Sequence, residues 1–450
     1  MVERFPIDIR AVAGMHFSAA TAAFQIEGAR TADGRGRSIW DDFVDAPGNV
    51  IDGSTAEPGP DSYHRVDDDI ALLAGLGVDR YRFSISWTRV IPNAGTDASV
   101  NPAGLDYYDR LVDGLLTAGI TPEPTLYHWD LPVAFETDGG WLNRDTASRF
   151  GDYAAVVAGR LGDRVRHWYT INEPASTSLQ GYALGELAPG RTLLFDSLPT
   201  VHHQLLAHGI AAPILREHGA VQVAPTLNHS LVLPASRTAD DQAAAGLLDG
   251  ILNRLFADPL LLGTYPDLSA FGAELPVADG DMELISAPNE VYGFNYYNPT
   301  TVRACAGPIP FEMVPTPGAP VTGFGPMWPI RPDTMRDFLI EMDRRYESAL
   351  PPIIITENGA SFPEPETTTA ELSDTARIDY LRGHLGAVID AKAAGVRIDG
   401  YTVWSLLDNF EWADGWSQRF GLVHVDMHTG TRTPKASYRW YRELISAARS

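Results

Sequence analysis

Short runs of β-branched and aromatic residues recur along the whole 450-residue chain. Several of these runs are almost continuously apolar, as in the letters PPIIIT before Glu357, which is typical of strands that are covered on both faces. Eight such runs predict eight strands, at residues 16–25, 80–86, 121–128, 167–172, 222–228, 291–297, 353–356 and 401–407.

Between the strands, apolar residues return every three or four positions, and this spacing predicts amphipathic helices. Residues 104–118 show the pattern, and Gly119 follows at the position where helices often end. Helices are also expected after Asp67 and over about 146–161, 200–218, 334–349 and 375–394. Strands that alternate with helices indicate a parallel sheet, and eight such units indicate a closed (β/α)8 barrel.

The sequence predicts a single α/β domain over residues 1–450, a (β/α)8 TIM barrel with long βα loops. A minimal barrel needs about 250 residues, so the remaining residues belong to the loops. The segment 307–332 is rich in proline and glycine, but it also holds Phe311, Phe324 and Trp328. We expect this segment to be an aromatic loop that folds back over a functional site.

Charge narrows the choice of ligand. The chain has 34 Lys+Arg and 58 Asp+Glu, so its formal net charge is −24. A surface this acidic repels nucleic acids, anionic membranes and strongly anionic substrates, and it favours a small neutral ligand. The single cysteine, Cys305, excludes an intramolecular disulfide. The first ten residues lack the apolar core of a secretory signal, so a cytoplasmic location is expected, and the oligomeric state stays open.

Polar and aromatic side chains gather where the predicted strands end, which is where this fold carries its active site. Amides and carboxylates bind hydroxyl groups, indole rings pack on the apolar face of a sugar ring, and two carboxylates hydrolyse glycosides. The spacings of a zinc hydrolase, a phosphate loop and a serine hydrolase are missing, so no metal and no cofactor are expected. The residues at the strand ends are Gln25, Arg82, His128, Asn172, Glu173, Asn295, Tyr297, Glu357, Trp404, Glu411 and Trp412.

Several segments taken together resemble glycoside hydrolase family 1, the β-glucosidase family. They are ATAAFQIEGA (20–29), YRFSISWTRVIP (81–92), LYHWDLP (126–132), TINEP (170–174), GFNYYN (293–298), ITENG (355–359) and WSLLDNFEWADGWSQRFGLVHVD (404–426). The resemblance runs from about residue 14 to residue 442. It implies a retaining β-glucosidase that acts on terminal non-reducing β-D-glucosyl residues of cellobiose-like and aryl β-glucosides, with some activity on β-galactosides and β-fucosides.

The resemblance also implies roles for single residues. Glu357 is the expected nucleophile, and Glu173 is the expected general acid and base. The side chains expected to support the nucleophile are those of Arg82, Tyr297 and Asn295. Those expected to bind the sugar are Gln25, His128, Asn172, Trp404, Glu411 and Trp412. On the leaving-group side we expect Trp328 and Ala175. Ala175 replaces the aromatic residue of many members, which predicts a pocket that is either wider or held mainly by Trp328.

Other interpretations stay open at this point. Glu173 is not the Gln of myrosinase-like members, and the acidic Glu411 argues against a phosphorylated sugar. A catalytically weak sugar-binding barrel and a metal-dependent barrel hydrolase are the alternative functions. Structural alternatives are core packing for Trp404 and His128 and a purely structural ion pair for Arg82, while the His202 and His203 pair is expected on an exposed helix face.

Overall fold

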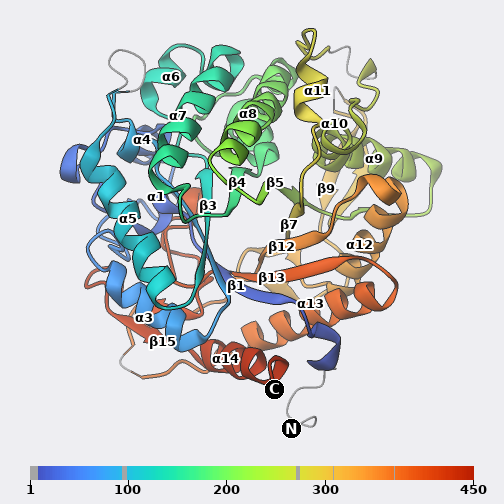
Figure 1. Ribbon diagram of the computed structural model, residues 1–450. Helices are drawn as coiled ribbons and strands as arrows, with labels where there is room; N and C mark the ends of the chain where they lie inside the picture. Colours follow the sequence, from blue (N-terminus) through green and yellow to red (C-terminus); the bar gives the residue numbers. More distant parts are fainter. Residues whose placement is uncertain (1–8, 94–98, 270–273, 308, 369) are drawn as a thin grey trace.

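The computed structural model describes residues 9–93, 99–269, 274–307, 309–368 and 370–450, and eight of its strands close into a parallel barrel (Figure 1). Their order around the barrel is β1-β13-β12-β7-β5-β4-β3-β2. They are β1 (His16–Ala20), β2 (Arg80–Ser84), β3 (Thr121–Tyr127), β4 (His167–Asn172), β5 (Gln222–His229), β7 (Tyr292–Tyr296), β12 (Ile353–Asn358) and β13 (Ile398–Trp404). The expected (β/α)8 TIM barrel is confirmed. Residues 1–8, on which the expected location depends, lie outside the described residues, as does residue 308 of the segment 307–332.

The large helices form the outer layer of the barrel (Figure 1). They are α3 (Val66–Leu76), α5 (Pro102–Thr117), α7 (Asp145–Leu161), α8 (Leu198–Glu217), α12 (Pro332–Tyr346), α13 (Thr375–Ala393) and α14 (Ala436–Ala448). The expected helices are therefore present. Where α3 ends, Gly77 has a φ of 78°, a left-handed conformation that glycine adopts without strain.

Two expected strands differ from the structure by three residues or more at one or both ends. The first ends at Ala20, and Gln25 lies in the short helix α1 (Ala23–Ile26). The apolar letters between them have no glycine or proline that would mark a strand end, and period alone does not separate a buried strand from a buried helix. The last strand begins at Ile398 and ends at Trp404, three residues earlier than expected.

The loops after the strands contain further small elements. The helices are α2 (Ile39–Asp45), α4 (Trp87–Val90), α6 (Val133–Thr137), α9 (Ala239–Asp249), α10 (Leu255–Leu262) and α11 (Asp281–Ile285), with the π-helices η5 (Ser176–Leu184) and η7 (Gly250–Arg254). The 3-10 turns are η2 (Ile9–Val12), η3 (Ala32–Gly34), η4 (Gly140–Leu142), η6 (Leu194–Ser197), η9 (Glu347–Ala349) and η10 (Trp412–Asp414). The strands are β6 (Val232–Pro234), β8 (Thr300–Ala304), β9 (Phe311–Val314), β10 (Val321–Thr322), β11 (Gly325–Pro329), β14 (Val423–Val425) and β15 (Arg432–Pro434).

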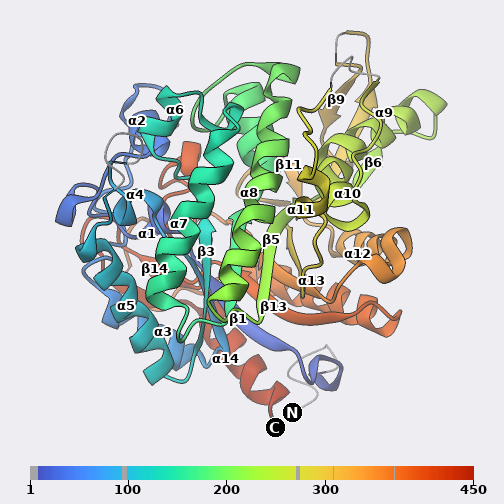
Figure 2. The ribbon, with the colours of Figure 1, turned by 45° about the horizontal axis from the view of Figure 1, so that its top comes forward.

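The segment 307–332 is thus not a plain loop, because it supplies β9 and the β10–β11 hairpin. Strands β6, β8 and β9 form a small sheet, and β6 and β9 lie beside α9 on one flank of the barrel (Figure 2). None of the helices in the described ranges is long and apolar enough to cross a membrane.

On the outer helix α8, the expectation of an exposed histidine pair is wrong. His202 and His203 are both buried rather than exposed. His202 Nε2 lies 2.8 Å from a carboxylate oxygen of Asp281, and His203 Nδ1 lies 2.9 Å from the carbonyl oxygen of Trp141. The loop elements cover this face of α8, which a pattern read along one helix does not reveal.

The register of the barrel strands prepares the functional site. Glu357 on β12 lies beside Asn295 on β7, and Asn295 lies beside Asn228 on β5. Asn172 on β4 lies beside Thr226 on β5. Polar side chains from neighbouring strands therefore share one level, at the carboxyl end of the barrel.

Candidate active site

One cavity of about 600 Å³ contains most of the residues expected in the site. Its lining includes Glu173, Glu357, His128, Asn172, Tyr297, Trp404, Glu411, Trp412, Trp328 and Ala175. These residues come from the carboxyl ends of several strands and from the loops that follow them. Gln25, Arg82 and Asn295 lie behind this wall and contact the lining residues from inside the barrel.

Two partners fix the carboxylate of Glu357, which lies near the end of β12. Arg82 donates from Nη1 to Oε1 at 2.5 Å, and the hydroxyl of Tyr297 donates to Oε2 at 2.6 Å. Both Glu357 and Arg82 are buried, so this ion pair is protected from screening by salt. Both carboxylate oxygens are held in place, and the group points into the cavity.

Glu173 follows β4 and faces the same cavity. Its Oε1 accepts a hydrogen bond from Asn295 Nδ2 at 2.8 Å, and its Oε2 accepts one from the hydroxyl of Ser176 at 2.9 Å. Burial, and next to it the negative charge of Glu357, raise the pKa of Glu173 to about 8. At neutral pH this carboxyl therefore carries a proton that it can give away. Its φ is 46°, a conformation rare outside glycine that is often found at functional sites.

Amide side chains connect the two carboxyl groups. Asn172 Oδ1 accepts hydrogen bonds from Arg82 Nη2 at 2.7 Å and from Asn295 Nδ2 at 3.1 Å. The same Arg82 binds Glu357, and the same Asn295 binds Glu173. A single network of short polar contacts thus sets the position of one carboxyl relative to the other.

Gln25 and Glu411, both expected to bind the sugar, lie close to each other. Gln25 Nε2 donates to the Phe410 carbonyl at 2.9 Å, and it lies 3.4 Å from an oxygen of Glu411. Within the described structure, Gln25 Oε1 is buried and has no hydrogen-bond partner, so it can accept a bond from a ligand hydroxyl. Burial, followed by the charges of Asp414 and Glu357, raises the pKa of Glu411 well above its usual value.

His128 lies close to two indole rings and nearly parallel to both. Its ring centre is 5.7 Å from that of Trp404 and 5.9 Å from that of Trp412, and the planes differ by 20° and 18°. Its Nε2 lies 3.1 Å from Asn172 Nδ2. Burial, and then the charge of Arg82, lowers the pKa of His128 well below its usual value. The imidazole is therefore neutral at pH 7. His128 is a buried, partnered histidine that also lines the cavity.

Of the two residues expected on the leaving-group side, Trp328 packs face to face on Phe324, with ring centres 4.3 Å apart and planes 19° apart. Trp328 also lies 5.7 Å from the ring of Tyr297. Ala175 is buried at the start of the helical segment after Glu173, where its methyl group adds little bulk to the wall.

Sequence reasoning missed two threonines of this network. Thr226 donates to Asn172 Oδ1 at 2.7 Å, and Thr356 donates to Asn295 Oδ1 at 2.6 Å. A signal was present, because each is a polar residue that directly follows apolar residues in a buried strand. A buried hydroxyl needs a partner, so such a residue points to a polar site within the barrel.

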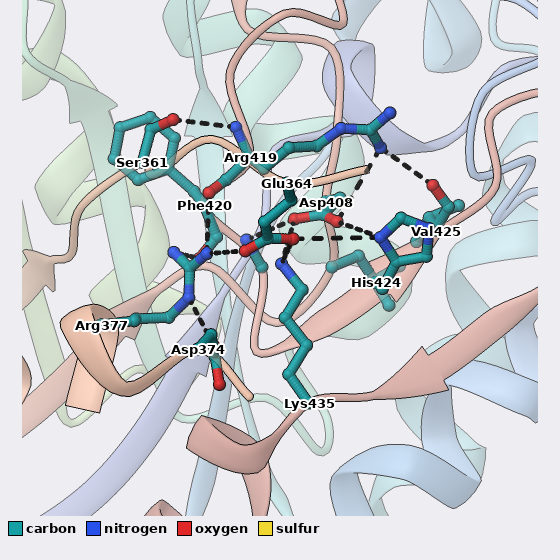
Figure 3. A network of polar contacts seen from close by, with 12 residues as sticks. Ser361, Glu364, Asp374, Arg377, Asp408, Arg419, Phe420, His424, Val425 and Lys435 are labelled. Carbon is teal, nitrogen blue, oxygen red and sulfur yellow. Dashed lines mark hydrogen bonds and ion pairs between the residues drawn. The ribbon is translucent and has the colours of Figure 1, made fainter. Parts of the chain in front are cut away.

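A buried cluster of charges surrounds Asp408, which lies three residues before Glu411 in the chain (Figure 3). Lys435 Nζ lies 2.6 Å from Glu364 Oε2 and 2.8 Å from Asp408 Oδ1. Arg377 donates to Asp374 at 2.9 Å and also binds Glu364. Asp408 also accepts a hydrogen bond from the Gly421 amide at 2.9 Å. The cluster therefore anchors both ends of residues 408–421, the segment that brings Glu411 and Trp412 to the cavity.

Glu364, Asp408 and His424 together have the spacing of a metal site, because one ligand atom from each lies within 4.8 Å of the others. The ammonium group of Lys435 already bridges the two carboxylates, however, and it supplies the positive charge that they need. We therefore interpret these residues as an internal salt-bridge network and not as a metal site. They do not line the cavity.

The comparisons with known proteins agree with this geometry. A family model described as Glycosyl hydrolase family 1 matches residues 9–450. The chain belongs to glycosyl hydrolase family 1. Beta-glucosidase A of Acetivibrio thermocellus is 42% identical over 448 residues, which cover 95% of this chain and 96% of that protein. The bifunctional β-D-glucosidase/β-D-fucosidase of Bifidobacterium breve is 41% identical over 463 residues, covering 96% and 97%.

Solved structures of this glycosyl hydrolase family share the fold closely. The psychrophilic β-glucosidase of Micrococcus antarcticus has a TM-score of 0.93 and 42% identity, and the match covers 97% of each chain. The family 1 β-glucosidase of Thermotoga maritima in complex with isofagomine lactam has a TM-score of 0.91 and 39% identity, covering 97% of this chain and 98% of that one. Membership makes this chain a glycosidase of the retaining type.

Proposed function

We propose that the protein is a β-glucosidase that releases terminal non-reducing β-D-glucosyl residues from aryl β-glucosides and cellobiose-like disaccharides. The observation that carries this proposal is the pair of carboxyls in one cavity. Glu357 is an anion fixed by Arg82 and Tyr297, whereas the raised pKa of Glu173 leaves that carboxyl protonated. One group is prepared to attack and the other to protonate, which is the arrangement that retention requires.

In the first step Glu357 attacks the anomeric carbon, and the bond from that carbon to the leaving oxygen breaks. Glu173 donates its proton to the leaving oxygen as the bond breaks, so the aglycone departs as a neutral alcohol. The product is a glycosyl ester on Glu357. Forming the ester removes the negative charge of Glu357, and the pKa of Glu173 should fall because that charge helped to raise it.

In the second step Glu173, now ionised, takes a proton from a water molecule, and the water oxygen attacks the same carbon. The ester bond breaks, glucose leaves with its original configuration, and both carboxyls return to their starting states. The two carboxyl groups of a retaining enzyme are about 5–5.5 Å apart. The shared contacts of Glu173 and Glu357 with the Arg82, Asn172 and Asn295 network support a close pair of this kind.

The remaining side chains hold the sugar in this proposal. Asn172 contacts the 2-hydroxyl, an interaction that strengthens in the transition state. Trp404 lies beneath the ring. The side chains proposed for hydroxyls 3, 4 and 6 are Gln25, His128, Glu411 and Trp412. The Bifidobacterium breve relative is named for both glucosidase and fucosidase activity, which supports a second activity on β-fucosides here.

We also propose that residues 1–450 act as one catalytic domain. The family match, which spans residues 9–450, supports this. A relative from Thermotoga neapolitana is named 1,4-beta-D-glucan glucohydrolase, which supports a part in cellulose breakdown for the disaccharide activity. The cytoplasmic location and the lack of nucleic-acid partners stay predictions.

The first test is hydrolysis of p-nitrophenyl β-D-glucoside, with NMR of the first glucose anomer released. The proposal expects β-glucose first. Glu357→Ala should lose hydrolysis, and azide should then restore turnover and give the α-glucosyl azide, because azide attacks the face that the nucleophile leaves open. Glu411→Ala is the matched control: it also removes a cavity carboxylate, but azide should not rescue it. An α-anomer released first, or binding with no turnover, would refute the proposal.

Glu173→Ala tests the acid. It should slow substrates with poor leaving groups far more than activated aryl glucosides, because only the former need the proton. Equal slowing of both kinds of substrate would show that Glu173 is not the proton donor.

A further inference from the structure

Five of the exposed apolar side chains of this acidic protein line the outer part of the catalytic cavity, its mouth. They are 37% to 55% exposed and come from two loops, the one after β4 and the one after β7. Exposed apolar groups that line a cavity are available to contact a ligand. These residues are Leu184, Leu194, Ile309, Met313 and Met327.

The apolar wall continues inward to the carboxyls. Phe311, Phe324 and Trp328 line the same cavity as Glu173 and Glu357, so the mouth and the two carboxyls belong to one cavity. Cavities of about 300–1,000 Å³ hold ligands of drug size, and the volume of about 600 Å³ here exceeds what one sugar ring needs. Whatever fills the outer part is therefore attached to the sugar as its leaving group.

Most of the exposed side chains that line the outer part suit an apolar group better than a second sugar. Five of them are aliphatic or thioether groups, which cannot donate a hydrogen bond, and buried hydroxyls without partners cost binding energy. The exposed polar ones are Gln180 and Glu186. Among the described residues that line the cavity, none is lysine or arginine, so an anionic leaving group finds no counter-charge. Its acidic residues are Glu173, Glu357, Glu411 and Asp414 around the sugar end and Glu186 at the rim.

We infer that the preferred substrates are β-glucosides of long apolar alcohols, whose chain lies along the wall from Trp328 to the mouth residues Leu194 and Met313. This inference rests on the proposed function and names its leaving group. It differs from the cellobiose-like substrates, whose second ring carries several hydroxyls.

The test is a series of n-alkyl β-D-glucosides from ethyl to octyl, each below its micelle concentration, with cellobiose alongside. The leaving alcohols of this series have nearly the same acidity, so the bond-breaking chemistry is constant and only burial of the chain changes. Each fully buried methylene raises kcat/KM by up to about fourfold. We expect a rise of at least about tenfold from ethyl to octyl, and a higher kcat/KM for octyl glucoside than for cellobiose.

Variants locate the effect. Leu194→Ser and Met313→Ser should lower the octyl-to-ethyl ratio of kcat/KM, because a hydroxymethyl group replaces the apolar contact. Leu116→Ser is the matched control: Leu116 is 41% exposed on α5 and does not line the cavity, so its ratio should equal that of the unaltered protein.

A flat chain-length dependence together with turnover of ethyl glucoside, or cellobiose turned over as well as octyl glucoside, would overturn the inference and leave the proposed function standing. If no β-glucoside, p-nitrophenyl β-glucoside included, were hydrolysed, the proposed function would fail and the inference with it. An unchanged octyl-to-ethyl ratio in both variants would also overturn it, because the chain would then lie elsewhere.

Discussion

Removing the charge of Glu357 should lower the pKa of Glu173. That pKa is about 8, against an ordinary value of 4.5, and burial is its first cause and the charge of Glu357 its second. Two unit charges about 5.5 Å apart, the spacing of retaining carboxyls, interact by about 3 kcal/mol at an effective dielectric constant of about 20. This corresponds to about 2 pH units. Glu357→Gln should therefore lower the pKa of Glu173 by up to about 2 pH units and leave it above 4.5, because burial remains.

The assay is ¹³C NMR of protein labelled at the glutamate side-chain carboxyl, titrated from pH 4 to pH 10. To assign the Glu173 signal, Glu173→Gln is introduced both into the unaltered protein and into Glu357→Gln. The carboxyl signal that disappears in each case belongs to Glu173. A midpoint that stays the same in both would show that Glu357 does not act on Glu173. A midpoint near 4.5 in the unaltered protein would refute the role of burial as well.

Three further predictions follow from the same geometry. Glu173 must be protonated to act, and its raised pKa keeps it protonated below about pH 8. In a pH–rate profile, kcat/KM for a substrate with a poor leaving group should therefore fall by about tenfold per pH unit above about pH 8. A plateau of kcat/KM up to pH 10 would contradict this. Lys435→Met removes the cation that bridges two buried carboxylates and should lower the free energy of unfolding in urea by about 3–5 kcal/mol. Arg37→Met, in an exposed ion pair, should lower it by less than about 1 kcal/mol, and equal effects would argue against the buried cluster as an anchor. Trp404→Ala should weaken transition-state binding by about 1–3 kcal/mol, measured as the loss in kcat/KM, and an unaltered kcat/KM would assign Trp404 to core packing.

The barrel, and the meeting of most of the expected site residues in one cavity, could be predicted from the sequence for physical reasons that can be named. Strands covered on both faces leave continuous apolar runs, and a barrel places the residues after them at one rim, so Glu173 and Glu357 could be paired before any geometry was known. Gln25 shows where prediction from an apolar run fails, because the strand before it ends at Ala20, five residues before the end that the run predicted. His202 shows it again, because the loop residue Asp281 that covers it is far away in the sequence.

The charged cluster around Lys435 could not be foreseen from any local pattern. Its partners Glu364 and Asp408 come from separate loops. In the sequence, Lys435, Glu364 and Asp408 each look like an ordinary surface charge. Only the closing of the barrel brings them together. Their burial is costly unless all partners are present, so the arrangement holds the loop with Glu411 in one position rather than in several.

The two ends of the cavity therefore differ in how they are held. The sugar end consists of short polar contacts between barrel strands, and moving any one of Arg82, Asn172 or Asn295 leaves a buried partner unsatisfied. The mouth consists of side chains such as Leu194 and Met313, which contribute area but few directed contacts. Substitutions at the mouth can thus change the preferred leaving group without disturbing the carboxyl pair, whereas substitutions in the polar network should lower turnover of every substrate alike. The octyl-to-ethyl ratio separates these cases, because a defect in the network cancels from it and a defect at the mouth does not.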